Sequence, residues 1–194
     1  MNSIDLSVFR WINRWPDGLE PLMLFLSKGI DSWWVRVPLL GLFLALVLRP
    51  TTRRGALVAF LMWPLANLMT DVAKASIPFG RPGNEVPDAI IRVGMSQSMG
   101  TASAHSANMM FIGVALTLSF GWRGAPAILL ALAVGLSRIY VAAHYPSQVL
   151  FGWTLGALAA FIAFHTVEAG VRVATANRER KSASAASESP SEAS

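Results

Sequence analysis

Long apolar stretches, each bounded by charged or turn-forming residues, are the feature that most restricts how this chain can fold. Hydrophobic residues make up 54% of the chain, charged residues only 14%, and the mean hydropathy is +0.48. A soluble domain carries roughly 25% charged residues, so this chain has too few charges to cover a surface in water. Because backbone polar groups in lipid must be paired within the protein, we predict an all-α, polytopic membrane helix bundle.

Five apolar stretches are candidates for membrane-spanning helices. They cover Trp33–Leu48, Gly55–Ala73, Ala107–Trp122, Gly124–Ala143 and Val149–Val167. Several lie near the short end of the roughly 17–25 residues that a spanning helix needs. Together they predict one transmembrane domain over residues 33–171.

The two ends of the chain differ from this domain. Within residues 1–32, the apolar side chains of Leu6, Phe9, Ile12 and Trp15 follow a helical stripe, which predicts an N-terminal amphipathic helix in the membrane interface. This start does not resemble a cleaved signal peptide, because acidic residues interrupt it and no cleavage site follows an apolar run. Residues 172–194 change to Arg, Lys and Glu and then to Ser, Ala, Glu and Pro, which predicts a disordered cytoplasmic tail.

The loop charges predict an orientation. Arg49, Arg53 and Arg54 lie between the first two predicted spans, and Arg123 lies between the third and fourth. The two sides carry equal numbers of Lys and Arg, but on the other side three belong to the clusters described below and acidic residues accompany most of the rest. Because basic loops favour the cytoplasm, we expect residues 74–105 on the outer side. The isoelectric point near 10.4 could suggest a nucleic-acid partner. We expect none, because the basic residues are scattered at the ends of apolar stretches and no basic, aromatic-rich patch is present.

Six polar residues fall at the outer ends of the predicted spans, where buried polar groups are costly and indicate function. They are Lys74, Arg81, Ser103, His105, Arg138 and His144. Lys and Arg at helix ends can instead extend toward lipid headgroups, but that does not explain six such residues on one side. They fall in three clusters: KASIPFGRP (Lys74–Pro82), TASAHSAN (Thr101–Asn108) and SRIYVAAHYPSQ (Ser137–Gln148).

The residue types in these clusters suit a phosphoryl group. Lys74, Arg81 and Arg138 supply positive charge for the negative charge that spreads over the oxygens of a phosphoryl group in transfer. Ser103 can donate a hydroxyl, and the N–H groups from Ala104 onward begin a helix, which makes an anion site. We also expect a second helix N-terminus at Pro146, beside His144.

The three clusters together resemble the signature of the type 2 phosphatidic acid phosphatase family, K-x6-RP, PSGH and SR-x5-H-x3-D, over roughly residues 70–155. The run HYPSQVLFGW looks most like the short bacterial undecaprenyl diphosphate phosphatases. The resemblance implies an integral enzyme of the bacterial plasma membrane, facing outward, that removes phosphate from a lipid phosphate or diphosphate without a metal or cofactor. Its partners would be the lipid substrate and membrane lipids. The sequence leaves the oligomeric state open.

The resemblance also implies roles for individual residues. His144 would attack phosphorus as the nucleophile, and His105 would serve as general acid and then base. The phosphate would bind to Lys74, Arg81, Ser103, Ala104 and Arg138. Two positions depart from the family pattern. PSGH reads Ala102–His105 here, and the aspartate that orients the nucleophilic histidine is Gln148.

Gln148 leaves alternatives open. Its oxygen can accept a hydrogen bond from His144, but an amide can also flip and donate, and Asp71 is another carboxylate that could take the part. The protein could therefore be a phosphotransferase that passes phosphate to an alcohol, or a non-catalytic phospholipid-binding protein. A metal site is disfavoured, because no carboxylate or cysteine lies at a ligand-like spacing from either histidine. We expect His165 to be an interfacial or core histidine.

Overall fold

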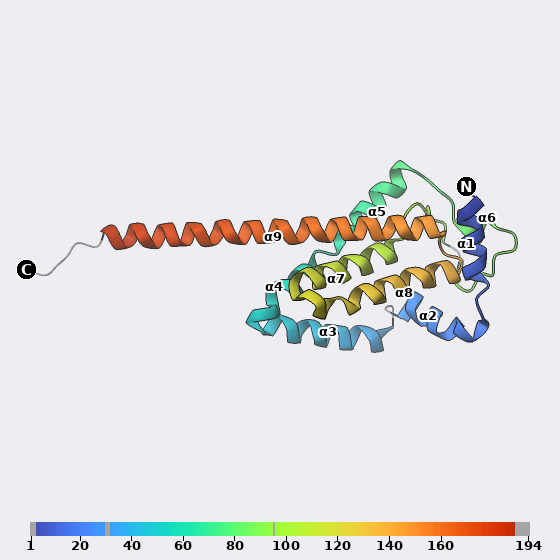
Figure 1. Cartoon of the computed structure of the whole chain (residues 1–194), viewed down its shortest axis with the longest axis horizontal. Helices are drawn as coiled ribbons and strands as arrows, with labels where there is room; N and C mark the ends of the chain where they lie inside the picture. Colours follow the sequence, from blue (N-terminus) through green and yellow to red (C-terminus); the bar gives the residue numbers. More distant parts are fainter. Residues whose placement is uncertain (1–2, 30–31, 95, 189–194) are drawn as a thin grey trace, which may run out of the picture.

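The computed structural model describes residues 3–29, 32–94 and 96–188, and over these ranges it consists of helices and loops. The helices are α1 (Ser3–Asn13), α2 (Glu20–Lys28), α3 (Trp33–Leu48), α4 (Pro50–Leu61), α5 (Pro64–Ser76), α6 (Pro82–Glu85), α7 (Ala104–Phe120), α8 (Pro126–Tyr140) and α9 (Pro146–Glu188). Short 3-10 turns lie at Asp17–Leu19 and Gly121–Gly124. The end of α8 and the start of α9 lie at the same end of the molecule as α1 and α6 (Figure 1). The predicted all-α fold is confirmed.

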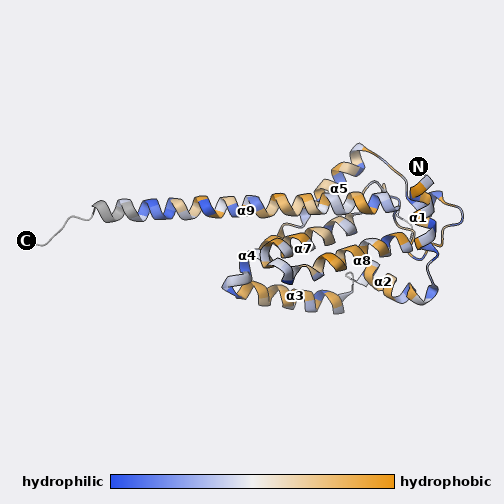
Figure 2. Ribbon diagram, viewed as in Figure 1, coloured by the Kyte–Doolittle hydropathy of each residue, from blue (hydrophilic) through white to orange (hydrophobic). Residues whose placement is uncertain are grey.

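The structure supports fewer membrane-spanning helices than the five predicted. Among the described residues, two helical stretches are long and apolar enough to cross a membrane: Pro50–Ser76, which joins α4 and α5, and Pro146–Ser182 of α9. A third results if Asp17–Lys28 and Trp33–Leu48, bent by 54°, count as one span. Helix α8 is apolar but shorter. Apolar residues dominate α3, α7, α8 and the first part of α9, whereas the far part of α9 is more hydrophilic (Figure 2).

The C-terminal part of the chain differs from the prediction. Residues 172–188 do not form the disordered tail that we expected, because they continue helix α9 to Glu188. Ala, Arg, Glu and Lys favour helix, and extending an existing helix avoids the cost of a new nucleus. With 43 residues, α9 is about 64 Å long at 1.5 Å per residue. Residues 189–194 lie outside the described part of the chain. His165 lies exposed on α9, with its ring 4.1 Å from that of Phe161.

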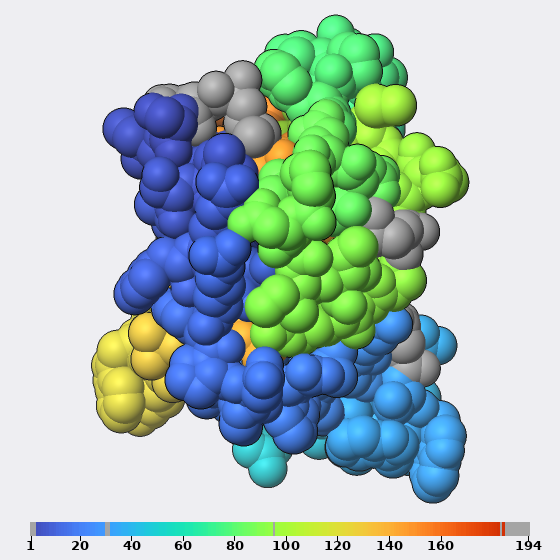
Figure 3. Space-filling view, turned by 90° about the vertical axis from the view of Figure 1, so that its right-hand side faces the viewer, coloured from blue at the N-terminus to red at the C-terminus, as the bar shows by residue number. Residues whose placement is uncertain are grey.

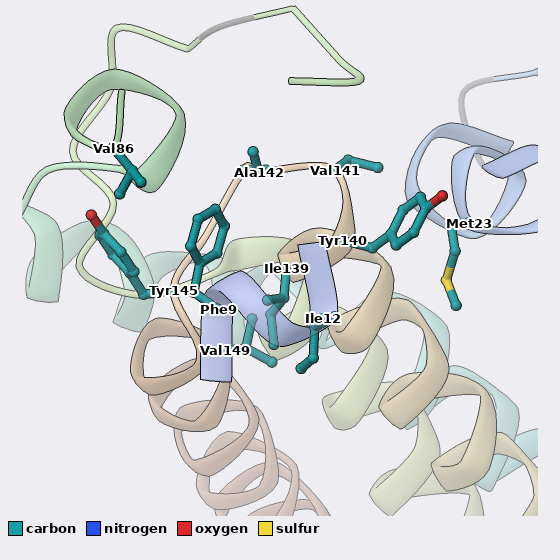
Figure 4. Packing of buried hydrophobic residues seen from close by; sticks show 11 residues of the cluster. Phe9, Ile12, Met23, Val86, Ile139, Tyr140, Val141, Ala142, Tyr145 and Val149 are labelled. Carbon is teal, nitrogen blue, oxygen red and sulfur yellow. The ribbon is translucent and has the colours of Figure 1, made fainter. Parts of the chain in front are cut away.

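The N-terminal stripe forms a helix, and the structure uses it for packing within the protein. Phe9 and Ile12 of α1 are buried in one cluster with Tyr145, which directly precedes α9, and with Val149 in the first turn of α9 (Figure 4). The ring of Phe9 meets that of Tyr145 edge-on, with centroids 5.6 Å apart. The apolar stripe is therefore explained by contacts with α8 and α9, and a position in the membrane interface remains a prediction.

Two side chains fix the loop after α6 to the N-terminal segment and to the end of α8. The Asn13 amide donates to the carbonyls of Ile90 and Tyr140 at 2.9 and 2.8 Å, and it accepts from Ile90 N at 2.8 Å. Arg92 donates to the carbonyls of Asn13 (2.8 Å) and Tyr140 (3.0 Å), with its guanidinium 4.0 Å from the Tyr140 ring centroid. The N-terminal segment and this loop together cover the end of the bundle (Figure 3).

Candidate active site

A sharp bend between α8 and α9 carries His144. Helix α8 ends at Tyr140, and Ala142 takes a left-handed conformation with φ of 63°. The Arg138 carbonyl then accepts from Ala143 N at 3.0 Å and from His144 N at 3.2 Å. A left-handed residue just past a helix end allows this kind of closure. The bend explains the spacing of the third motif, because it folds His144 back onto Arg138.

The hydrogen bonds of His144 define its protonation state. Arg81 Nη1 lies 3.0 Å from His144 Nε2, and a guanidinium can only donate, so Nε2 is the acceptor. The proton is therefore on Nδ1, which lies 3.0 Å from Gln148 Oε1 and 3.2 Å from Gly100 O. Burial, then the charges of Arg81 and Arg138, hold the pKa of His144 well below its ordinary value. The imidazole is neutral, with the lone pair that a nucleophile needs on Nε2.

Gln148 is held in one orientation. Its Nε2 donates to Gly80 O at 2.7 Å, and its Oε1 accepts from Tyr145 N at 3.2 Å as well as from His144 Nδ1. A flipped amide would place its NH₂ against two donors and its oxygen against a carbonyl. Asp71 does not take the place of the family aspartate, because its carboxylate pairs with Lys74 at 3.1 Å. The amide thus presents an oxygen to His144 without a carboxylate.

Arg81 is buried, and all three nitrogens of its guanidinium donate hydrogen bonds. Its Nε donates to Ser98 O at 2.8 Å, and its Nη2 donates to Ser98 Oγ at 2.8 Å and to Met99 O at 3.3 Å. Its Nη1 also reaches Ala143 O at 3.1 Å. Burial lowers the pKa of Arg81, but an arginine remains charged in proteins. The loop contacts therefore fix a positive charge beside His144.

A small cavity lies beside this pair. It is lined by Arg81, Arg138, Ala143 and the loop residues Gly94 and Ser96, among others, and its volume is about 30 Å³. Arg81 and Arg138 therefore border the same cavity.

Close packing brings the second motif against the third. Ser103 N donates to Gln148 O at 3.0 Å. An added Cβ at Gly152 would lie 2.5 Å from Ser103 O, and one at Gly156 would collide with the carbonyl of Ala107. Glycines at these two positions let α7 and α9 touch backbone to backbone. The first turn of α7, with Ala104 and the half-buried His105, therefore lies beside the start of α9.

Ser103 has a structural role as the N-cap of α7. Its side chain is fully buried, and its Oγ accepts from Ser106 N at 3.3 Å and from Ser106 Oγ at 2.9 Å. N-cap serines stabilise a helix in this way. Its contact with phosphate remains a prediction.

Lys74 and the N-terminus of α9 each contact a carboxylate of the protein itself. Lys74 lies in the last turn of α5, pairs with Asp71 and is not among the residues that line the cavity. The N-terminus of α9 is already occupied, because Ser147 N and Oγ donate to the Asp5 carboxylate at 2.9 and 2.6 Å. A carboxylate at a helix N-terminus interacts favourably with the helix dipole. The helix N-terminus expected at Pro146 is therefore confirmed, and the carboxylate of Asp5 from α1 binds there.

Some residues of the site were not predicted. Gly100 accepts from His144 Nδ1, and an added Cβ there would lie 2.5 Å from Gly80 O and 2.9 Å from Gln148 Nε2. A glycine directly before the second motif could have indicated such a close approach. Ser98, which binds Arg81, has no comparable signal. Among the described residues, no three His, Asp or Glu side chains converge as metal ligands would.

The part of the chain that carries these residues matches a known protein family. Residues 55–172 match the model of the PAP2 superfamily, whose span includes Arg81, His105, Arg138 and His144. The chain belongs to the PAP2 superfamily. An undecaprenyl-diphosphatase from Sulfolobus acidocaldarius is 29% identical over 154 residues, which cover 78% of this chain and 72% of that protein.

Solved structures share the fold. The crystal structure of Aquifex aeolicus LpxE has a TM-score of 0.70 at 21% identity, with 84% of this chain and 96% of that chain covered. The first transmembrane PAP2-type phosphatidylglycerolphosphate phosphatase from Bacillus subtilis has a TM-score of 0.64 at 22% identity, with 86% and 88% covered. Family, fold and apolar helices together support the coarser prediction of a PAP2-type membrane lipid phosphatase.

The structure predicts the effect of restoring the family aspartate. Gln148→Asp should lower kcat for lipid phosphate hydrolysis by about tenfold or more, because a partly buried hydrogen bond to Gly80 O is lost and the carbonyl faces an anion instead. Steady-state kinetics of the purified variant test this, with Gln97→Asp in the exposed loop as control. A higher kcat in Gln148→Asp would show that the site still favours a carboxylate.

Proposed function

We propose that the protein hydrolyses a lipid phosphate or diphosphate through a phosphohistidine at His144. The supporting observation is the contact between His144 Nε2 and Arg81 Nη1 at 3.0 Å, with the proton held on Nδ1 by Gln148. The nitrogen that would attack phosphorus and a cation that would bind the phosphate oxygens are thus already adjacent.

In the first step, an oxygen of the incoming phosphate replaces His144 Nε2 as the acceptor of the hydrogen bond from Arg81 Nη1. The lone pair on Nε2 is then free to attack. Nε2 forms a bond to phosphorus as the bond between phosphorus and the leaving oxygen breaks. His105 gives its proton to that oxygen, which leaves on the lipid alcohol or lipid phosphate. Arg81 and Arg138 offset the negative charge on the transferring group.

In the second step, water attacks phosphorus, His105 takes its proton, and the bond to Nε2 breaks to release inorganic phosphate. While the phosphoryl group is attached, the imidazole carries a positive charge and keeps its Nδ1–H. Gln148 Oε1 and Gly100 O, at 3.0 and 3.2 Å, stabilise this cation with two neutral oxygens. The contacts that hold Gln148 in place favour a working catalyst over the non-catalytic lipid-binding alternative.

Undecaprenyl diphosphate is the first substrate to test, because the related Sulfolobus acidocaldarius protein is an undecaprenyl-diphosphatase. Phosphate release by the purified protein would be measured on undecaprenyl diphosphate, phosphatidic acid and phosphatidylglycerol phosphate in mixed micelles. Added alcohol acceptors would reveal a phosphotransferase by a phosphorylated alcohol. No release from any lipid would contradict the proposed function.

Metal independence is a second expected result. Because Arg81 and Arg138 supply positive charge beside His144, EDTA should leave the rate within about twofold of the untreated enzyme, and vanadate should inhibit it. The rate would be measured with EDTA alone and after addition of excess Mg²⁺. Loss of activity in EDTA that Mg²⁺ restores would contradict this mechanism.

We further propose that the site faces outward from the plasma membrane, on the basis of the basic residues at Arg49, Arg53 and Arg54. A cysteine at the exposed Asn84 should react with a membrane-impermeant maleimide in intact cells, and one at the exposed Thr51 should react only after lysis. The chain has no cysteine of its own, so labelling reports these positions alone. The opposite pattern would place the site in the cytoplasm.

A further inference from the structure

A serine outside the matched family region contacts a motif arginine. Ser27 lies in the last turn of α2, whereas the family model matches residues 55–172. Arg138 Nη1 donates to Ser27 Oγ and to Ser27 O, the latter at 3.4 Å. The Ser27 side chain has no exposed surface. The N-terminal segment therefore reaches the guanidinium of Arg138.

The Ser27 hydroxyl is buried within an otherwise apolar part of α2. Helix α2 has the sequence EPLMLFLSK and packs against α8. Its residues Leu24 and Leu26 are partly buried against an apolar cluster. A buried hydroxyl costs free energy unless it is hydrogen-bonded, and an apolar residue would serve packing alone equally well. The partner of Ser27 is a charged group, and hydrogen bonds to charged groups are the stronger ones.

The arginine that Ser27 holds belongs to the site. Arg138 lines the same cavity as Arg81, and its positive charge lowers the pKa of His144. The arginine side chain is long and loses much rotational freedom when it is fixed. A hydrogen bond that fixes it before substrate arrives reduces the ordering that phosphate binding must produce.

We propose that Ser27 is a positioning residue that holds Arg138 toward the phosphate subsite. This inference rests on the proposed function. Arg92 reaches Asp17, in the 3-10 turn before α2, at 3.2 Å and Glu20, the first residue of α2, at 3.4 Å, so one side chain links the loop over the cavity to the start of α2. The N-terminal segment thereby contributes to the binding of the lipid phosphate.

Ser27→Ala in the full chain tests the proposal. We expect KM for the lipid phosphate and the Kd for vanadate to rise about tenfold, with kcat changed less, since one charge-assisted hydrogen bond is removed from a binding group. The melting temperature should stay close to that of wild type. Ser7→Ala, which removes an exposed serine hydroxyl of α1, is the control. An unchanged vanadate Kd in Ser27→Ala would overturn the proposal.

A double-mutant cycle separates positioning from simple packing. In an Arg138→Lys background, Ser27→Ala should cost little further vanadate affinity, because the group that it positions is absent. An equal loss in both backgrounds would overturn the proposal in favour of a structural role. If Ser27→Ala does not fold, Ser27→Thr and Ser27→Val replace it, since they have similar shapes and differ in the hydroxyl. Vanadate should then bind more tightly to the threonine variant than to the valine variant. Equal vanadate affinities would overturn the positioning role of Ser27.

Calorimetric vanadate binding keeps this inference separate from the proposed function. A wild-type protein that hydrolyses no lipid phosphate but binds vanadate in a Ser27-dependent way would support positioning and contradict the enzyme. An active wild-type protein whose Ser27→Ala variant has an unchanged vanadate Kd would support the enzyme and contradict the positioning role. Wild type that binds no vanadate would overturn the inference.

Discussion

His144→Ala is expected to lower kcat for lipid phosphate hydrolysis by about 10⁴-fold or more, since removal of a nucleophile in other hydrolases costs up to about 10⁶. The side chain is almost fully buried, its Nδ1 is held by Gln148 and Gly100, and its Nε2 contacts Arg81. The loss should fall on kcat, because bond formation to phosphorus is removed.

The measurement combines phosphate release with trapping of the intermediate. Wild type incubated with ³²P-labelled lipid phosphate and quenched in base should carry label on His144, because phosphohistidine is acid-labile. His144→Ala should carry none. His165→Ala, which changes an exposed histidine on α9, is the matched control and should keep wild-type kcat. Substantial turnover in His144→Ala would rule out this histidine as the nucleophile.

Arg81→Lys is expected to lower kcat/KM by about 10³-fold, a value within the range reported for arginines that stabilise phosphoryl transfer. Charge is kept, but an ammonium cannot reproduce the planar fork that contacts His144 together with Ser98 and Met99. The variant should lose both the aligned cation and the anchor of the loop beside the cavity. Steady-state kinetics and vanadate affinity would be measured together.

The control for this substitution is Arg123→Lys, at an exposed arginine beside Trp122 in the turn that joins α7 to α8, at the end of these helices away from the site. It should leave kcat/KM unchanged. A thermal melt of Arg81→Lys shows whether the loop contacts also stabilise the fold. If Arg81→Lys retains kcat/KM within about threefold, a positive charge alone suffices, and the fixed guanidinium is not needed.

Motif spacing predicted the centre of the site because the spacing reflects local geometry. Arg138 and His144 lie in one bend, and Gln148 lies one helical turn after His144, where the amide can reach back to Nδ1. Arg81 comes from a separate element, and the sequence assigned it through its motif alone. The helices followed from apolar runs, although Pro64 divides the second predicted span into α4 and α5.

Contacts between distant segments could not be predicted in this way. Asp5 caps α9 from 142 positions away, and Ser27 reaches Arg138 across 111 positions. A serine within an apolar helix, or an aspartate near the start of the chain, gives no periodic signal for its partner. The same holds for Asn13, which lies outside the apolar stripe of the N-terminal segment and is buried, with its amide donating to two carbonyls.

The left-handed backbone at Ala142 has a consequence for how the protein folds. An alanine in this conformation costs about 1–2 kcal/mol, so the isolated segment would favour continuing helix α8 over turning. The bend is held from outside, where Gly83 N donates to Ala142 O at 3.1 Å and Arg81 donates to Ala143 O at 3.1 Å. The turn that presents His144 should therefore form late, only when the segment carrying Arg81 docks. Partly folded chains should have neither residue in place, so nucleophile and cation are acquired in one cooperative event.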